Sequence, residues 1–180
     1  MLVYLGRPAA TPAPARAPEL QEHEPVEDVP VVESSLDRGL RDIRRNDRGF
    51  DPSRFVGYIG MVFRMAQRAW MSGDLESLRD RLTPEMYDAM HAERTRLVGA
   101  GRVNVVGDID ITAMVTEAWQ ERERDYLTAH IRGSIIDYTV DEAAGTIVAG
   151  SKTIPRDVEE FWTFARPAGL NFWMLSAIQT

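Results

Sequence analysis

The stretch FDPSRFVGYIGMVFRMAQRAWMSGDLESLRDRLTPEMYDAM, residues Phe50 to Met90, carries the clearest structural signals of this 180-residue chain. Asp51-Pro52 predicts a helix start, because aspartate caps helix N-termini and proline fits the first helical position. Gly73 is suited to end that helix, since glycine adopts the left-handed terminal conformation at little cost. Asp74 and Thr83-Pro84 then predict the starts of a short leucine-rich helix and of a third helix.

Apolar side chains in the first of these helices recur at helical spacing, and its polar positions are few. Phe55, Ile59 and Val62 share one face, while Tyr58 and neighbouring methionines form a second apolar strip. A helix with so little polar surface is expected to be buried on most sides, against a sheet.

Beyond the helical region, which we place at 51–98, the apolar period shortens from about 3.6 to 2 residues. A first long strand is predicted from Val103 to Trp119 and a second from Tyr126 to Val140. Three shorter strands are predicted at 146–154, 158–165 and 172–178. Helices followed by an antiparallel meander over 103–180 indicate an α+β fold, with the helices packed on one face of the sheet.

The segment 36–48 is predicted to be a basic amphipathic helix, with Ser34 or Ser35 as its N-cap. Leu36, Leu40 and Ile43 form one apolar stripe. Five arginines surround the stripe: Arg38, Arg41, Arg44, Arg45 and Arg48. Such a helix either lies on an acidic membrane surface or packs on its own domain through the stripe. We predict these arginines as contacts to a membrane or a partner.

Residues 1–35 are rich in proline, alanine and glutamate, a composition that favours an extended arm or linker and cannot form a core. The arm is interpreted as a spacer, as a disordered tail without a partner, or as a segment lying across a neighbouring subunit. Leu2–Leu5 is apolar but too short for a signal peptide or a membrane-spanning helix. It is either the remnant of a lost anchor or an ordinary chain terminus.

Composition excludes several functional classes. The net charge of -7 disfavours nucleic acid as a ligand, because general nucleic-acid binders are basic. The absence of cysteine excludes disulfides, thiolate metal sites and cysteine nucleophiles. The three histidines lack a ligand spacing, so neither a metal nor a cofactor is predicted.

Several segments, taken in order, resemble the Tim44-like domain family. The Asp-initiated aromatic helix, the Ala69-Trp70 pair, the Gly73-Asp74 corner and the Thr-Pro-Glu helix start match the opening of that domain. EEFWTFAR, residues Glu159 to Arg166, resembles the family's late strand, and NFWMLSAI from Asn171 resembles its closing strand. The resemblance covers about Leu36 to Thr180.

The resemblance implies a strongly curved antiparallel sheet, the cone-like roll of the nuclear-transport-factor-two-like superfamily. The family's mitochondrial member is a peripheral inner-membrane protein that tethers an import-motor chaperone to the translocation channel. In that tether, amphipathic helices before the roll contact cardiolipin-containing membrane, and the equivalent here is Leu36–Arg48. A peripheral position on the cytoplasmic or matrix-like side of an inner membrane is therefore expected. The tether's long N-terminal part has no counterpart in this sequence, so only the domain's binding role is expected to transfer.

We therefore predict a non-catalytic scaffold that binds a membrane surface, a lipid or a membrane protein complex. Its cavity is predicted to be lined by Phe55, Tyr58, Met61, Met65, Trp70, Trp119, Trp162 and Trp173. One alternative is an accessory subunit held by the proline-rich arm. Another is a lyase- or isomerase-type enzyme of the superfamily, with acid–base candidates Asp110, Tyr126, His130, Asp137 and Tyr138. Strand alternation argues against the enzyme, because the apolar residues between Tyr126 and Ile135 fit the core face better.

Overall fold

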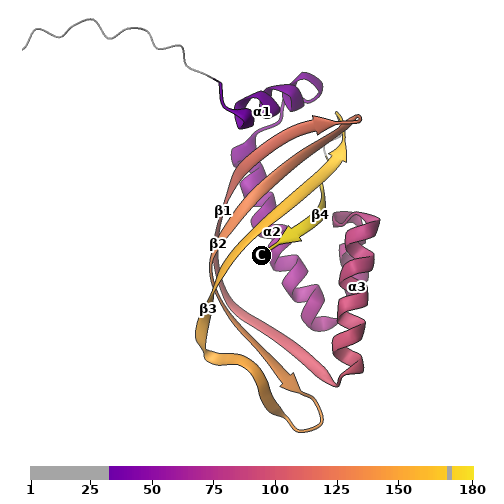
Figure 1. The fold of residues 1–180 in the computed structure, drawn as a ribbon, viewed down its shortest axis with the longest axis vertical. Coiled ribbons are helices and arrows are strands. Elements are labelled where there is room, and N and C mark those ends of the chain that lie inside the picture. Colours follow the sequence, from indigo (N-terminus) through magenta and orange to yellow (C-terminus); the bar gives the residue numbers. More distant parts are fainter. Residues whose placement is uncertain (1–32, 170–171) are drawn as a thin grey trace, which may run out of the picture. The chain divides into compact units, whose positions relative to one another are not determined.

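The computed structural model describes residues 33–169 and 172–180, so Leu2–Leu5 and most of the predicted arm lie outside the described residues. Within these residues, four helical segments precede four strands, which confirms the α+β prediction (Figure 1). The helices are α1 (Ser35–Asn46), α2 (Pro52–Ser72), the 3-10 helix η1 (Leu75–Arg81) and α3 (Pro84–Gly99). The strands are β1 (Arg102–Glu121), β2 (Arg124–Asp141), β3 (Thr146–Pro167) and β4 (Met174–Gln179).

The predicted capping residues begin and end these helices. The Ser34 side chain accepts a hydrogen bond from the Asp37 backbone N–H at 3.0 Å, and Asp51 accepts one from the Ser53 N–H at 2.9 Å. Gly73 ends α2 with a φ of 81°, a left-handed conformation that other residues adopt only with strain. The helix boundaries expected from the sequence are confirmed to within one or two residues.

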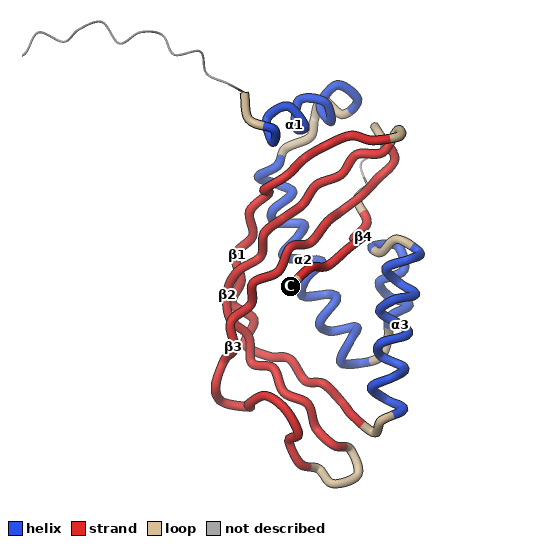
Figure 2. Tube along the Cα trace, viewed as in Figure 1, coloured by secondary structure: helices blue, strands red, loops and turns tan. Residues whose placement is uncertain are grey.

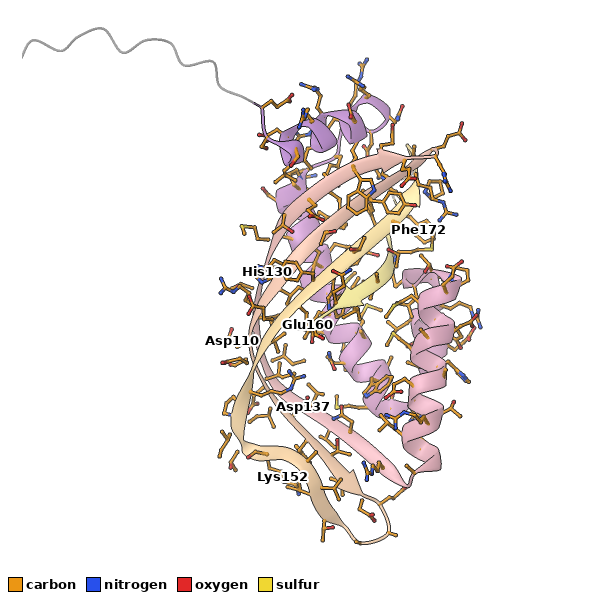
Figure 3. The ribbon with its side chains drawn as sticks, viewed as in Figure 1. Asp110, His130, Asp137, Lys152, Glu160 and Phe172 are labelled. Carbon is orange, nitrogen blue, oxygen red and sulfur yellow. The ribbon has the colours of Figure 1, made fainter. Side chains whose placement is uncertain are left out.

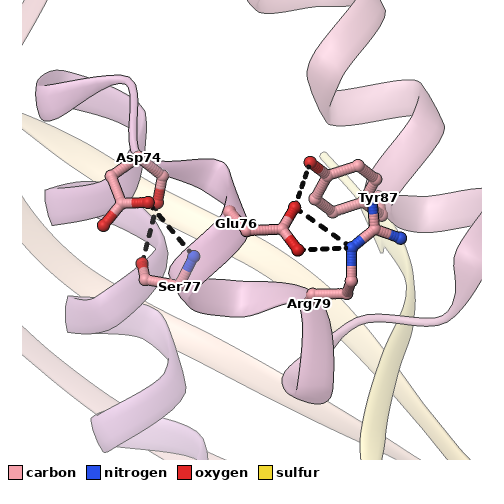
Figure 4. A network of polar contacts seen from close by, with 5 residues as sticks. All are labelled: Asp74, Glu76, Ser77, Arg79 and Tyr87. Atoms are coloured by element: carbon pink, nitrogen blue, oxygen red, sulfur yellow. Dashed lines mark hydrogen bonds and ion pairs between the residues drawn. The ribbon is translucent and has the colours of Figure 1, made fainter.

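A small polar network fixes the corner between η1 and α3 (Figure 4). Arg79 donates to both oxygens of Glu76, at 2.9 and 3.1 Å, and Tyr87 of α3 donates to the same carboxylate at 3.0 Å. The hydrogen bond from Arg79, followed by that from Tyr87, lowers the pKa of Glu76. Because the Glu76 and Arg79 side chains are exposed, this network sets geometry more than stability.

The sheet has the simple order β1-β2-β3-β4, with every pair antiparallel (Figure 2). The two strands predicted at 146–154 and 158–165 are one continuous strand, β3. Ile135 pairs with Arg156 and Asp137 with Ser151, so the intervening Pro155 lies in a bulge. Proline lacks the ladder donor and is tolerated at such bulges, which is why it did not end the strand.

The sheet is open and is not strongly curled, so the prediction of a cone-like roll is wrong in this respect. β1 and β4 form its two edges. The short β4 pairs only with the last part of β3, between Phe161 and Ala165, and therefore cannot bring the edges together. The hairpin that joins β2 and β3 extends beyond the helices (Figure 1), and residues 142–150 are all exposed.

The core lies between α2 and the inner face of the sheet. Ile59, Val62 and Phe63 of α2 are fully buried, and the ring of Phe63 lies 5.1 Å from that of Trp162 on β3. The second apolar strip is less buried than predicted, since Met61 is 42% exposed. The helices cover one face of the sheet, so the outward side of α2 has no second layer to bury it.

Candidate functional site

α1 packs on β1 through its apolar stripe. Leu40 and Ile43 are buried, and Gly39 lies so close to β1 that a Cβ there would collide with the carbonyl oxygen of Ala118. This is the packing alternative considered for the helix, and it determines which face of α1 is available. Because the stripe is occupied by the sheet, only the polar face of α1 is free to meet another surface.

All five predicted arginines of this segment are exposed, and we name them the arginine face: Arg38, Arg41, Arg44, Arg45 and Arg48. Arg38, Arg41 and Arg45 follow each other at intervals of three and four, which places them on one side of the helix opposite the stripe. Arg41 forms an ion pair with Glu33 at 2.6 Å and Arg45 with Asp42 at 3.0 Å. Arg44 donates to the Phe50 carbonyl at 3.2 Å.

Asp47, the C-cap of α1, turns away from this surface. Its carboxylate accepts a hydrogen bond from Arg166 Nη1 at 2.9 Å, and its side chain is only 14% exposed. Asp47 is thereby removed from the surface, which leaves five arginines against three carboxylates, Glu33, Asp37 and Asp42. The arginine face is therefore locally basic although the chain as a whole is acidic.

Arg166 is the centre of a buried charge network. It is 1% exposed, and its Nε donates to Asp125, which is fully buried, at 2.9 Å. Gln120 donates to the other oxygen of the same carboxylate at 2.7 Å. A sequence signal for this site existed: Arg166 follows Trp162 and Phe164 at intervals of two, so alternation places it on the core face.

Next to Arg166 lies a pocket of about 380 Å³, which we name the aromatic pocket. Of the residues predicted to line a cavity, Phe55, Tyr58 and Trp173 line this pocket. The ring of Phe55 lies 5.2 Å from that of Trp173, and the Tyr58 hydroxyl donates to the Trp173 carbonyl at 2.5 Å. Burial, partly offset by the nearby Arg81, raises the pKa of Tyr58.

A second pocket of about 340 Å³ lies between α2, α3 and the late strands. The predicted residues Trp70 and Trp162 line it together with Met86, Met90 and Ile178. The predicted cavity set is therefore divided between two pockets.

The remaining three predicted cavity residues, Met61, Met65 and Trp119, line neither of these pockets. Met65 packs against the core. Trp119 lies on β1, where its ring stacks at 5.0 Å on Tyr126 of β2.

The acid–base candidates lie on the long strands, where Figure 3 labels Asp110, His130 and Asp137. None of the five candidates lines either pocket. His130 Nε2 lies 3.1 Å from a carboxylate oxygen of Glu159, but Glu159 is 62% exposed and the pair lines neither pocket. Asp137 is occupied by Asn104 and Arg156 at 2.7 and 2.6 Å. A histidine–carboxylate pair without a substrate cavity lacks the setting that general acid–base catalysis needs.

Helices on one face of an open antiparallel sheet, with a basic helix at one end, define the class as a small α+β domain. The chain belongs to the Tim44-like domain family, whose model matches residues 36–180. Domains of this family are generally membrane-associated binding domains and are typically non-catalytic.

The fold also occurs in a crystal structure of the intermembrane space region of the chloroplast protein ARC6. The match has a TM-score of 0.51 and 11% sequence identity, and it covers 72% of this chain and 95% of that one. No curated protein matches the sequence. None of the helices in the described ranges has the length and apolar character needed to cross a bilayer.

Proposed function

We propose that this protein is a peripheral membrane-binding domain that docks on an anionic bilayer through the arginine face. The observation that carries the proposal is the division of α1 into two faces: its apolar stripe is buried on β1, and its arginines are exposed. The helix is thus held in a fixed orientation with its basic side outward. Membership of the Tim44-like family, whose domains are membrane-associated, supports the same function. The location that goes with this proposal is the cytoplasmic or matrix-like side of an inner membrane.

The expected attraction is modest. A basic residue near an anionic membrane surface contributes about 1 kcal/mol. Arg41 and Arg45 already have carboxylate partners and contribute less than that. The face therefore contributes on the order of 3 to 5 kcal/mol, which gives weak and reversible binding. The net charge of -7 means that the other surfaces of the chain are repelled by an anionic membrane. The domain therefore binds with the arginine face toward the bilayer.

Co-sedimentation with vesicles tests the proposal. One variant replaces all five residues of the arginine face by glutamine. The control variant replaces five exposed arginines elsewhere, so that the net charge changes equally: Arg68, Arg96, Arg102, Arg122 and Arg124. We expect the native chain and the control to bind vesicles that contain phosphatidylglycerol and to release them as salt is raised, because charge attraction is screened.

Loss of binding in the first variant alone supports the proposal. Equal binding of both variants, or equal binding to pure phosphatidylcholine, contradicts it. Retention on native membranes without affinity for protein-free vesicles would instead indicate a membrane protein complex as the partner.

A further inference from the structure

We propose that the aromatic pocket binds a small organic anion, a carboxylate or phosphate carried on an apolar body. The pocket combines three arginines with an aromatic wall and is of the size of small-ligand sites. Its lining contains none of the arginine face, so this proposal is independent of membrane docking.

Arg166 supplies the first observation. Its Nε and Nη1 donate to Asp125 and Asp47, while its Nη2 is buried and donates to nothing in the described part of the chain. A buried guanidinium nitrogen without an acceptor is costly, since hydrogen-bond donors in protein interiors are normally paired. An oxyanion seated beside Arg166 would supply the missing acceptor through one charge-assisted hydrogen bond to Nη2.

Two further arginines bring positive charge to the pocket, whose Arg166 is itself paired with the buried Asp125. Arg54 and Arg81 line it together with Arg166. The carboxylates on the lining are Asp47, which binds Arg166, and Asp51, which caps α2 and lies 3.7 Å from Arg54. Arg81 has no carboxylate within ion-pair distance among the described residues, so it is available to a ligand.

Aromatic rings make up much of the remaining lining. The rings of Phe50 and Phe55 lie 5.8 and 5.2 Å from that of Trp173, and Trp173 itself lies over the Arg166 guanidinium at 4.4 Å. Phe172, also on the lining, is 44% exposed. Flat rings beside a cationic group suit a ligand whose charged end is an oxyanion and whose body is apolar or aromatic.

The inference is tested by titrating the 180-residue chain with phenyl phosphate. Binding is monitored through the NMR signals of the Trp173 indole N–H and the Arg166 Nε–H. Phenylpropionate is the carboxylate probe, and benzyl alcohol and inorganic phosphate supply the apolar and anionic parts alone. Arg81→Gln removes one pocket cation without disturbing the buried network. Arg68→Gln on the exposed side of α2 is the matched control.

We expect both aromatic anions to shift the two signals, and Arg81→Gln to weaken phenyl phosphate binding about tenfold, the weight of one charge-assisted hydrogen bond. Arg68→Gln should leave the dissociation constant unchanged. Benzyl alcohol binding as tightly as phenyl phosphate would overturn the proposal, as would inorganic phosphate binding equally well. The same holds if no anionic probe moves the Trp173 signal, or if both variants lose binding alike. None of these outcomes bears on the proposed membrane docking, because the pocket lining contains none of the arginine face.

Discussion

Arg166 and Asp125 form a buried ion pair at a place where a protein core normally holds apolar side chains. Replacing Arg166 by methionine leaves Asp125, which is fully buried, without its counter-charge. We expect a loss of about 3–5 kcal/mol in the free energy of unfolding, the range for breaking one side of a buried pair. Urea denaturation measures this loss.

Asp47→Asn serves as the comparison, since its side chain is partly exposed and only one hydrogen bond from Arg166 is weakened. It should cost clearly less than Arg166→Met. If the two variants unfold at the same urea concentration, the buried pair is not the determinant described here.

The buried hydroxyl of Tyr58 is expected to make the domain less stable at high pH. Burial raises its pKa in the folded chain above the value of 10.0 that it has when exposed. The folded state then holds the phenolic proton more tightly than the unfolded state does. The resulting stabilisation is complete below pH 10 and is lost as the pH rises through the folded-state pKa.

Thermal unfolding between pH 9 and 12 should therefore show a fall in stability that Tyr58→Phe reduces. Tyr126→Phe, on the opposite face of the sheet, is the control for general alkaline denaturation. A fall of the same size in native and Tyr58→Phe chains would refute this assignment.

For single residues, the sequence predicted which face of the sheet a side chain lies on better than it predicted which charged groups are buried. Alternation placed Leu127, Ala129 and Ile131 on the core face, and all three are fully buried. The buried Asp125 was not foreseen, because a carboxylate next to a charged turn is normally exposed. Its partner is 41 positions away, and a pairing at that distance depends on the β2–β3 register, which composition does not reveal.

Among the elements, the docking of α1 on β1 determines whether the arginine face has a fixed orientation. Alanine in place of Gly39 improves helix propensity by about 1 kcal/mol, yet its Cβ would meet the Ala118 backbone. Backbone collisions outweigh propensity, so Gly39→Ala should destabilise the domain by about 1–3 kcal/mol.

Gly57 in α2 provides the matched control, since a Cβ there would meet nothing within 4 Å. Gly57→Ala should stabilise the domain by about 0.5–1 kcal/mol, because it restricts the unfolded chain. Denaturation midpoints measure both changes. If Gly39→Ala also stabilises the domain, α1 does not lie against β1 as described.

The helices were the most predictable elements, because their caps are local: Ser34, Asp51, Asp74 and Thr83 each accept a backbone hydrogen bond at the predicted start. The strands were harder to predict. The bulge that contains Pro155 is accommodated by the partner strand, and nothing local distinguishes such a proline from one that ends a strand. The sheet is open because β4 is short and pairs with only five residues of β3, Phe161 to Ala165. The number of residues that pair is set by the arrangement of the strands and cannot be predicted from the β4 sequence alone.

For the folded region as a whole, stability should be unevenly distributed. The β2–β3 hairpin around residues 142–150 is exposed throughout, whereas Leu127 and Ile131 on the same sheet are fully buried. Hydrogen exchange should therefore be fast in the hairpin and slow around 127–131, since exposed segments open without unfolding the core. Uniform protection along β2 and β3 would contradict this distribution.

The most direct test of membrane docking uses the absence of cysteine in the chain, which allows a single fluorophore to be attached at a chosen position. One label is placed on the arginine side of α1 through Asp37→Cys and another on the distant hairpin through Ala144→Cys, both at exposed positions. With vesicles that contain phosphatidylglycerol, the account predicts a blue-shifted emission for the α1 label, reversed by salt, and no change for the hairpin label. Equal shifts at both positions, or a shift at the hairpin alone, would contradict docking through the arginine face.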